Sequence, residues 1–190
     1  MERARRRGWN RKHLALYGLG VLLLMLGVLV PLLRSATVPT APISGNDFRI
    51  VAYQGEDVLG GYESQFSHVT AQGKPVVLNF FAGQCPPCRA EMPGFQRVAD
   101  EFHGKVTFVG VDIGPYVHLG SHDDAKRLLG ELNVRYPAAY AVDSTPLTIY
   151  SVLGMPTTVI FDSKGKVVET HTGILTEGEL RQKLMALAGS

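Results

Sequence analysis

The chain has 190 residues, of which 45% are hydrophobic and 19% charged, a composition that excludes a disordered protein and predicts one domain with an extension. The formal net charge is +2, yet the first 34 residues hold seven Lys or Arg and one acid, leaving twelve basic and sixteen acidic residues in the rest. This distribution argues against a nucleic-acid-binding domain. Two cysteines are too few for a multi-disulfide scaffold.

Residues 14–33, LALYGLGVLLLMLGVLVPLL, form an uncharged apolar run long enough for a helix to cross about 30 Å of bilayer hydrocarbon. Six Lys or Arg lie within residues 1–13 and only Arg34 follows, so the positive-inside rule places residues 1–13 in the cytoplasm and the rest of the chain outside. A cleaved signal peptide is the alternative, but its apolar stretch is usually roughly 7 to 15 residues long. We therefore predict a single-pass signal-anchor helix.

Residues 34–47 are small, polar or proline and predict a linker, so the folded domain is expected to span residues 48–190. The strand predictions rest on apolar runs of strand-forming types, and the helix predictions on apolar residues at helical spacing. In chain order, the predicted elements are a hairpin from residues 48–53 and the region around Val58, a buried strand over 75–82, a helix over 89–102, a buried strand over 106–112, a helix over 122–132, antiparallel strands over 157–162 and 166–172, and a helix over 177–187. We also expect Pro93 to kink or reset its helix.

Both cysteines lie in the segment Cys85-Pro86-Pro87-Cys88, between a predicted strand and a predicted helix. The unpaired N–H groups and partial positive charge of a helix N-terminus would stabilise a thiolate on Cys85. Cys88, one turn later, is placed to attack a mixed disulfide formed by Cys85. A structural disulfide usually closes a longer loop, and a zinc site needs further Cys or His ligands. The segment thus favours a redox-active pair, with Pro86 and Pro87 restricting the backbone between the cysteines.

The segments FFAGQCPPCRAEMPGF and GMPTTVIFDSKGKVV resemble the active-site and cis-proline segments of membrane-anchored thioredoxin-like proteins, the TlpA/ResA/CcmG group of AhpC/TSA-related redoxins. The similarity covers roughly residues 45–188, in the same order and spacing. It implies an α/β thioredoxin fold, a mixed sheet flanked by helices, with an N-terminal hairpin and a central insertion near residues 113–150. It also implies that Pro156 is a cis proline that faces the cysteines and helps to bind the substrate.

The resemblance assigns further roles around the cysteines. Glu91, three residues after Cys88, matches an acidic residue implicated in tuning the pair, the alternative being a solvated glutamate in the first helical turn. Asn79 replaces the buried Asp that cytoplasmic thioredoxins use in proton transfer, a role unavailable to an amide. Gln84 replaces the usual Trp, which should change the surface that meets partners. Met155 is either a substrate contact or a hydrophobic loop residue.

The function implied by the resemblance is that of a thiol–disulfide oxidoreductase on the outer side of a bacterial cytoplasmic membrane. Members of the group mostly receive electrons from a membrane thiol donor and reduce specific protein disulfides, such as those of haem-attachment cysteines in apocytochrome c or of copper-site cysteines. No cofactor apart from the Cys85–Cys88 disulfide is expected, and no metal. The chemistry of the residues alone permits reduction, oxidation or isomerisation.

Two rival functions involve the same cysteines. In a Cu(I) delivery module, Cys85 and Cys88 would be thiolate ligands for a soft ion. A peroxidase, built on the same fold, should carry a Pro-x-x-x-Thr/Ser-x-x-Cys pattern, which the residues before Cys85, NFFAGQC, do not contain.

Histidines offer a further metal hypothesis. His118 and His122 with Asp123 and Asp124 would form a surface ligand cluster, although Gly120 interrupts any helix across the set. His171 is better explained as a solvated or packed side chain than as a ligand.

Overall fold

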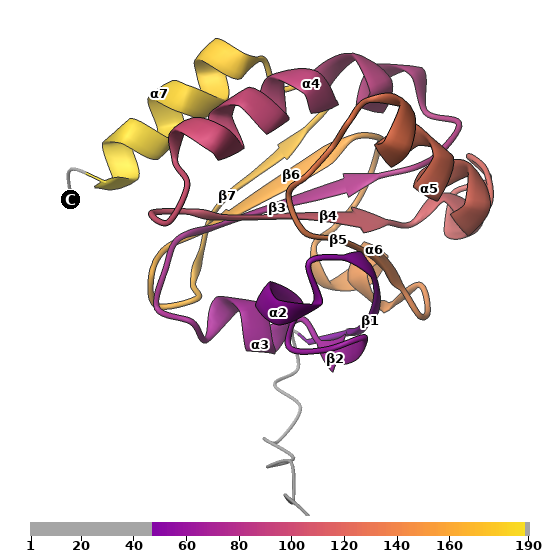
Figure 1. Ribbon diagram of the computed structural model, residues 1–190, viewed down its shortest axis with the longest axis horizontal. Helices are drawn as coiled ribbons and strands as arrows, with labels where there is room; N and C mark the ends of the chain where they lie inside the picture. Colours follow the sequence, from indigo (N-terminus) through magenta and orange to yellow (C-terminus); the bar gives the residue numbers. More distant parts are fainter. Residues whose placement is uncertain (1–46, 189–190) are drawn as a thin grey trace, which may run out of the picture. The chain divides into compact units, whose positions relative to one another are not determined.

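The computed structural model describes residues 47–188 (Figure 1). The predicted anchor at residues 14–33 and the linker up to residue 46 lie outside the described residues. Between residues 47 and 188, no helix is both long and apolar enough to cross a membrane.

The strands of the described region form a single mixed sheet with the order β2-β1-β5-β4-β3-β6-β7. They are β1 (Arg49–Gln54), β2 (Glu63–Gln65), β3 (Val76–Phe81), β4 (Thr107–Asp112), β5 (Ala138–Ala141), β6 (Thr157–Phe161) and β7 (Val167–Thr172). β4 pairs in parallel with both β3 and β5, whereas β6 runs antiparallel to β3. All six residues of β3 are buried, which confirms the prediction of a strand covered on both faces.

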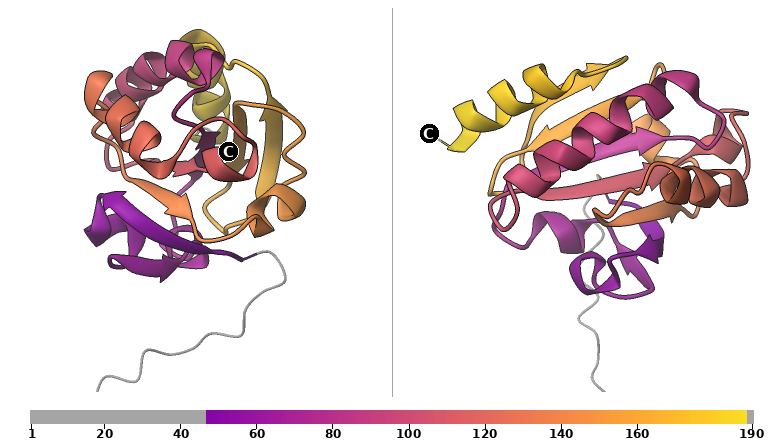
Figure 2. Two further views of the ribbon diagram at one scale, coloured as in Figure 1. Left: turned by 90° about the vertical axis from the view of Figure 1, so that its right-hand side faces the viewer. Right: turned by 45° about the horizontal axis from the view of Figure 1, so that its top comes forward.

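Helices cover both faces of this sheet. They are α2 (Glu56–Leu59), α3 (Ser67–Thr70), α4 (Pro86–Glu101), α5 (His122–Glu131), α6 (Thr145–Ile149) and α7 (Glu177–Ala188), with a 3-10 turn at Gly114–Tyr116. α4 and α7 lie side by side on one face, where ion pairs Arg97–Glu177 and Arg181–Glu101 join them (Figure 2). α2 and α3 lie on the opposite face (Figure 1).

Successive side chains of β3 point to opposite faces of the sheet, so the core is divided into two layers. Val77 and Phe81 belong to the apolar cluster beneath α4, α5 and α7, whereas Leu78 and Phe80 belong to the cluster beneath α2 and α3. Asn79 has the same parity as Val77 and Phe81, so its side chain enters the layer under α4. A polar group is thereby placed in the layer that also contains both cysteines.

Two sequence predictions about local structure are wrong. The hairpin exists, but its second strand is β2, and Val58 lies in α2 instead. This single helical turn is flanked by Gly55 and Gly60, both with positive φ, so the chain folds back before it reaches β2. The helix predicted from residue 89 begins at Pro86, since proline suits the first helical positions, and it continues beyond Pro93 to Glu101. Burial of its apolar face against the sheet outweighs the hydrogen bond that Pro93 cannot donate.

Candidate redox site

The cysteine pair lies where β3 leads into α4. Cys85 is the N-cap residue of α4, and its Sγ accepts a hydrogen bond from the backbone N–H of Cys88 at 3.2 Å. The two residues form a disulfide with their Cα atoms 5.3 Å apart. Cys85 is 2% exposed and Cys88 is fully buried. The predicted placement of Cys85 at a helix N-terminus is therefore present, with its sulfur facing the Cys88 N–H, which would stabilise a thiolate.

Glu91 lies one helical turn after Cys88 and is only 4% exposed, which rules out the alternative of a solvated glutamate. Its Oε1 accepts a hydrogen bond from Asn79 Nδ2 at 2.7 Å, and its Oε2 accepts one from the Leu175 backbone N–H at 3.1 Å. Burial raises the pKa of Glu91 to about 7, although these two hydrogen bonds act in the opposite direction. A carboxyl group in this range can both accept and release a proton near neutral pH.

Asn79 links the glutamate to the sheet. Its Nδ2 also lies 3.2 Å from Thr158 Oγ1 of β6, so one amide joins β3, α4 and β6. Asn79 itself has no acidic proton to transfer, as the sequence indicated. The structure adds that the buried carboxyl group beside Asn79 comes from α4, through Glu91, rather than from β3.

Pro156 immediately precedes β6, and the Met155–Pro156 peptide bond is cis, as the resemblance implied. Because β6 is antiparallel to β3 and Thr157 pairs with Phe80, Pro156 lies at the end of the sheet where β3 leads to the cysteines. Met155 is partly buried and packs against both core clusters. It is therefore partly a packing residue, and its remaining exposed surface lies in the loop before β6.

Gln84 is exposed and contacts the segment before α5. Its backbone N–H donates to the Leu119 carbonyl at 2.8 Å, and its Nε2 donates to Asp124 Oδ2 at 3.2 Å. The preceding residue, Gly83, packs so closely that a Cβ there would collide with the backbone of Asp124 and Ala125. The turn before Cys85 is thus fastened to the N-terminus of α5, a contact between distant segments that the sequence alone did not reveal.

The histidine cluster considered from the sequence does not form. His122 Nδ1 instead lies 2.7 Å from Oδ2 of the fully buried Asp112, and Tyr53 OH donates to the same oxygen at 2.9 Å. Asp124 accepts hydrogen bonds from Ser121 in the capping box of α5. His171 Nε2 lies 3.2 Å from the Ile174 carbonyl oxygen on an exposed segment.

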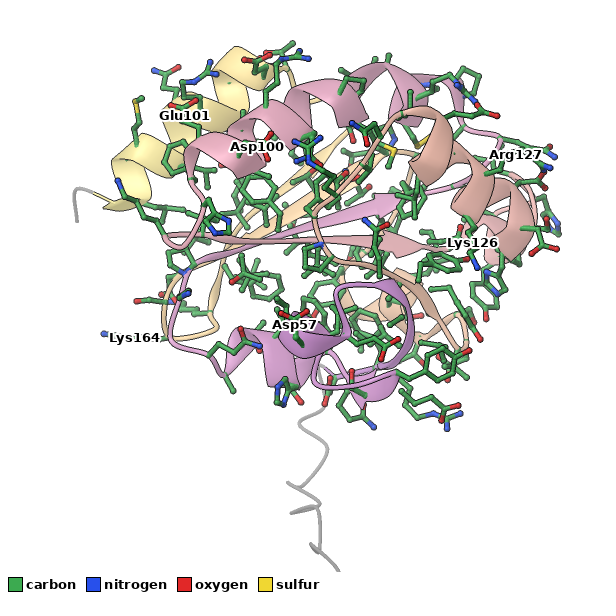
Figure 3. The ribbon with its side chains drawn as sticks, viewed as in Figure 1. Asp57, Asp100, Glu101, Lys126, Arg127 and Lys164 are labelled. Atoms are coloured by element: carbon green, nitrogen blue, oxygen red, sulfur yellow. A yellow bond between two sulfur atoms is a disulfide. The ribbon has the colours of Figure 1, made fainter. Side chains whose placement is uncertain are left out.

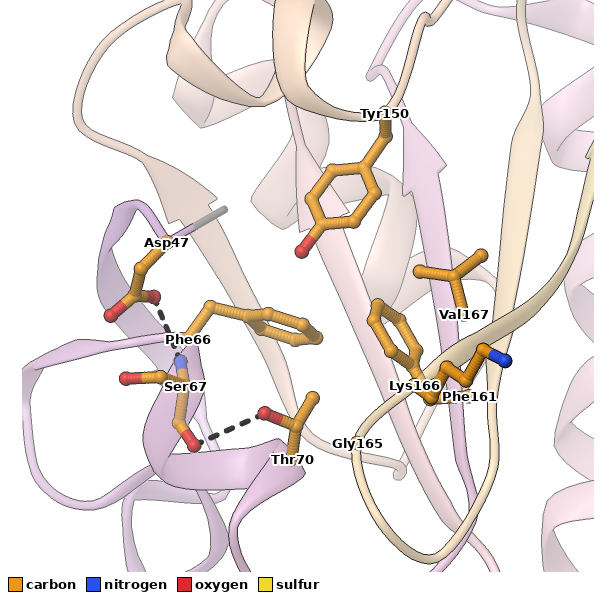
Figure 4. A pocket seen from close by; sticks show the side chains of 9 residues that line it. All are labelled: Asp47, Phe66, Ser67, Thr70, Tyr150, Phe161, Gly165, Lys166 and Val167. Carbon is orange, nitrogen blue, oxygen red and sulfur yellow. Dashed lines mark hydrogen bonds between the residues drawn. The ribbon is translucent and has the colours of Figure 1, made fainter. Parts of the chain in front are cut away.

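Within residues 47–188, no three His, Cys, Asp or Glu side chains are grouped so that they could hold a metal ion, so the described chain adds no third ligand to the cysteines. A cavity of about 370 Å³ has Phe66, Tyr150 and Phe161 in its wall and Asp47 and Lys166 among its polar residues (Figure 4). None of the residues predicted for the redox site lines it.

A mixed sheet flanked by helices, with a Cys-x-x-Cys disulfide at the start of α4 (Figure 3), defines a thioredoxin-like α/β protein. The chain belongs to the AhpC/TSA family, whose model matches residues 49–170. The thioredoxin-like protein YneN of Bacillus subtilis is 33% identical over 115 residues, which are 60% of this chain and 65% of YneN. The thiol-disulfide oxidoreductase ResA of Bacillus subtilis is 32% identical over 107 residues, 56% of this chain and 57% of ResA. The matches thus span less than two thirds of either relative.

Solved structures support the same fold. A putative thiol:disulfide interchange protein DsbE from Chlorobium tepidum superposes with a TM-score of 0.62 at 24% identity, covering 74% of this chain and 92% of that one. A secreted Mycobacterium tuberculosis disulfide oxidoreductase gives a TM-score of 0.59 at 25% identity, covering 75% of this chain and 98% of that one. The fold implied by the sequence resemblance is therefore confirmed for the described domain.

Proposed function

We propose that this protein is a thiol–disulfide oxidoreductase that uses Cys85 as the attacking thiolate and Cys88 as the resolving thiol. The observation that carries the proposal is the position of Cys85 as N-cap of α4, with its sulfur 3.2 Å from the Cys88 N–H and the second sulfur one turn away. Such a site favours the thiolate of the first cysteine and a rapid second attack by the other. The names of the relatives ResA and YneN agree with this chemistry.

In the reducing direction, the Cys85 thiolate attacks one sulfur of a substrate disulfide, whose S–S bond breaks and releases the first substrate thiolate. Cys88 then loses its proton and attacks Cys85 Sγ. The mixed disulfide breaks, the second substrate thiolate leaves, and the Cys85–Cys88 disulfide forms. Two electrons pass to the substrate, the proton of Cys88 ends on one departing sulfur, and the other departing sulfur takes its proton from solvent.

Glu91 is the proposed proton acceptor for Cys88. It lies one turn further along α4 in the same buried layer, and burial raises its pKa to about 7. A group with this proton affinity can take the proton of a thiol and return it to a leaving thiolate without a large free-energy difference. Asn79 and the Leu175 N–H hold both carboxylate oxygens in place during this exchange.

The proposed substrates are disulfide-bonded protein segments. The loop before Pro156 carries Leu153, which is 90% exposed, and Ile174 beyond β7 is 48% exposed. These loops are neighbours, since a Cβ on Gly154 would lie 3.1 Å from Thr172 Cγ2. Apolar surface beside a redox site suits an extended polypeptide better than a small polar disulfide.

We further infer that the protein acts as a reductant outside a bacterial cytoplasmic membrane. The apolar run at residues 14–33 and the basic residues before it support an anchor with this orientation. A reductant in that compartment needs a membrane thiol donor that returns electrons to the Cys85–Cys88 disulfide. Haem-attachment cysteines of apocytochrome c and copper-site cysteines are the substrates that the family resemblance favours.

The test compares Cys85→Ser and Cys88→Ser in the full chain, solubilised in detergent, reduced with dithiothreitol and freed of it before a disulfide-bonded peptide is added as substrate. We expect Cys85→Ser to abolish turnover and Cys88→Ser to accumulate a mixed disulfide with the peptide, visible by mass spectrometry. Each variant is the matched control of the other, because both remove the internal disulfide. Release of both peptide thiols by Cys88→Ser, with no external thiol present, would show that the resolving role is wrong.

A further inference from the structure

Two side-chain polar atoms in the described part of the chain are buried and have no hydrogen-bond partner, namely Asn79 Oδ1 and Tyr136 OH. Leaving a buried polar atom unpaired is unfavourable, and such atoms in folded proteins usually bind an ordered water. Both residues belong to the region under α4, because Tyr136 packs in the apolar cluster that contains Cys88 and Met92. Their shared location suggests a single explanation.

The backbone register brings the two atoms into the same neighbourhood. Asn79 of β3 pairs with Gly110 of β4, and a Cβ on Gly110 would lie 3.3 Å from Tyr136 Cε2. The ring of Tyr136 therefore lies over the bare backbone of Gly110, the residue of β4 that pairs with Asn79. Its backbone N–H points to Gln96 Oε1 of α4 at 3.3 Å, so Tyr136 sits between the sheet and the helix that carries Glu91.

The two unpaired atoms are chemically complementary. An amide oxygen only accepts hydrogen bonds, whereas a phenol hydroxyl donates one and accepts others. One water molecule can accept the hydroxyl proton of Tyr136 and donate to Asn79 Oδ1, and its second proton is then free for a carboxylate. Glu91 is the nearby carboxylate, since it is hydrogen-bonded to the amide nitrogen of the same Asn79. Its charge also raises the pKa of Tyr136, after the larger effect of burial.

We propose that Tyr136 is a positioning residue for Glu91, acting through one buried water that its hydroxyl shares with Asn79 Oδ1 and that donates a hydrogen bond to the Glu91 carboxylate. The water binds the ionised carboxylate better than the neutral acid, and so makes Glu91 a weaker base. The role of Tyr136 in disulfide exchange rests on the function proposed above. Its effect on the protonation of Glu91 is independent of that function.

The groups that face Glu91 come from each element around it. α4 contributes the cysteine pair one turn earlier, β3 contributes Asn79, and the segment before α7 contributes the Leu175 N–H. The segment before β5 contributes Tyr136. Burial and the two hydrogen bonds set the pKa of Glu91, and no cationic side chain within residues 47–188 contributes to it. A change at Tyr136 can therefore be read directly in the titration of Glu91.

The test uses Tyr136→Phe in the oxidised full chain in detergent, which needs no substrate or electron donor. The protonation of Glu91 is followed by carboxyl carbon NMR, with the signal assigned by its absence in Glu91→Gln. We expect Tyr136→Phe to raise the titration midpoint by at least about half a pH unit, roughly a threefold increase in proton affinity. The matched control is Tyr150→Phe, which alters a buried tyrosine on the other face of the sheet and should leave the midpoint unchanged.

An unchanged midpoint in Tyr136→Phe would overturn the proposal, as would an equal shift in Tyr150→Phe. If Tyr136→Phe does not fold, a high-resolution crystal structure of the wild-type oxidised protein decides the matter. Density for a water within hydrogen-bond distance of both Asn79 Oδ1 and Tyr136 OH supports the proposal, and its absence refutes it. Failure of the redox function would instead appear in the cysteine variants, whose readout is turnover rather than the titration of Glu91.

Discussion

Glu91→Gln should remove a pH dependence of stability that the buried carboxyl imposes on the oxidised protein. In the folded state, burial raises the pKa of Glu91 from 4.5 to about 7. Between these values the folded chain binds more protons at this site than the unfolded chain does, so the free energy of unfolding must fall as the pH rises. The stabilisation is complete below about pH 4.5 and is lost as the pH passes through about 7.

The difference between 4.5 and about 7 corresponds to about 3 kcal/mol at this single site. We would measure urea unfolding of the oxidised full chain by far-UV circular dichroism from pH 4 to pH 8, for wild type and Glu91→Gln. The difference in unfolding free energy between the two proteins should change by about 3 kcal/mol across this range, in favour of the variant at high pH. Glutamine keeps the size of the side chain, so parallel pH profiles would refute the reasoning that burial dominates at Glu91.

Two further predictions concern buried residues that hold the segments around the site in place, and urea unfolding checks both. Gly83→Ala should lower the unfolding free energy by about 1–3 kcal/mol because the new Cβ meets the backbone of Asp124; a neutral result would contradict the close packing of α5 on the turn before the cysteines. Asp112→Ala should cost about 2–5 kcal/mol because Tyr53 OH and the Gly114 N–H lose their buried acceptor, and Asp112→Asn, which keeps one oxygen, should cost less. Equal losses for the two Asp112 variants would contradict the role of hydrogen bonding.

The elements that could be predicted from the sequence are those with strong local patterns. The largely apolar run of β3, the helical spacing in α5 and the paired strands β6 and β7 are predictable to within one or two residues. β5 cannot be predicted from the sequence, because its four residues, AAYA, are too few and too rich in alanine to show a strand pattern. Its place in the sheet is decided by pairing with β1 and β4, which lie far away in the sequence.

The same distinction between local and long-range features applies to the candidate site. The cysteine pair at the junction of a strand and a helix is a local feature and was predicted, although the helix begins at Pro86 rather than at residue 89. The burial of Glu91 could not be predicted, because it depends on Leu175, 84 residues away, and on the covering helix α7. Similarly, the sequence offers His122 as a metal ligand, but its actual partner is Asp112, the last residue of β4, which nothing in the local pattern distinguishes.

The reduction potential of the Cys85–Cys88 pair would decide between the directions of exchange. The full chain in detergent is equilibrated with thiol buffers of defined potential, and the fraction of dithiol is read by alkylation. The proposed function predicts a single two-electron transition at or below about −270 mV, the range of thioredoxin, as befits a reductant supplied by a membrane thiol donor. A transition near about −120 mV would make the protein an oxidant, and a disulfide that no buffer reduces would contradict a redox role for the pair.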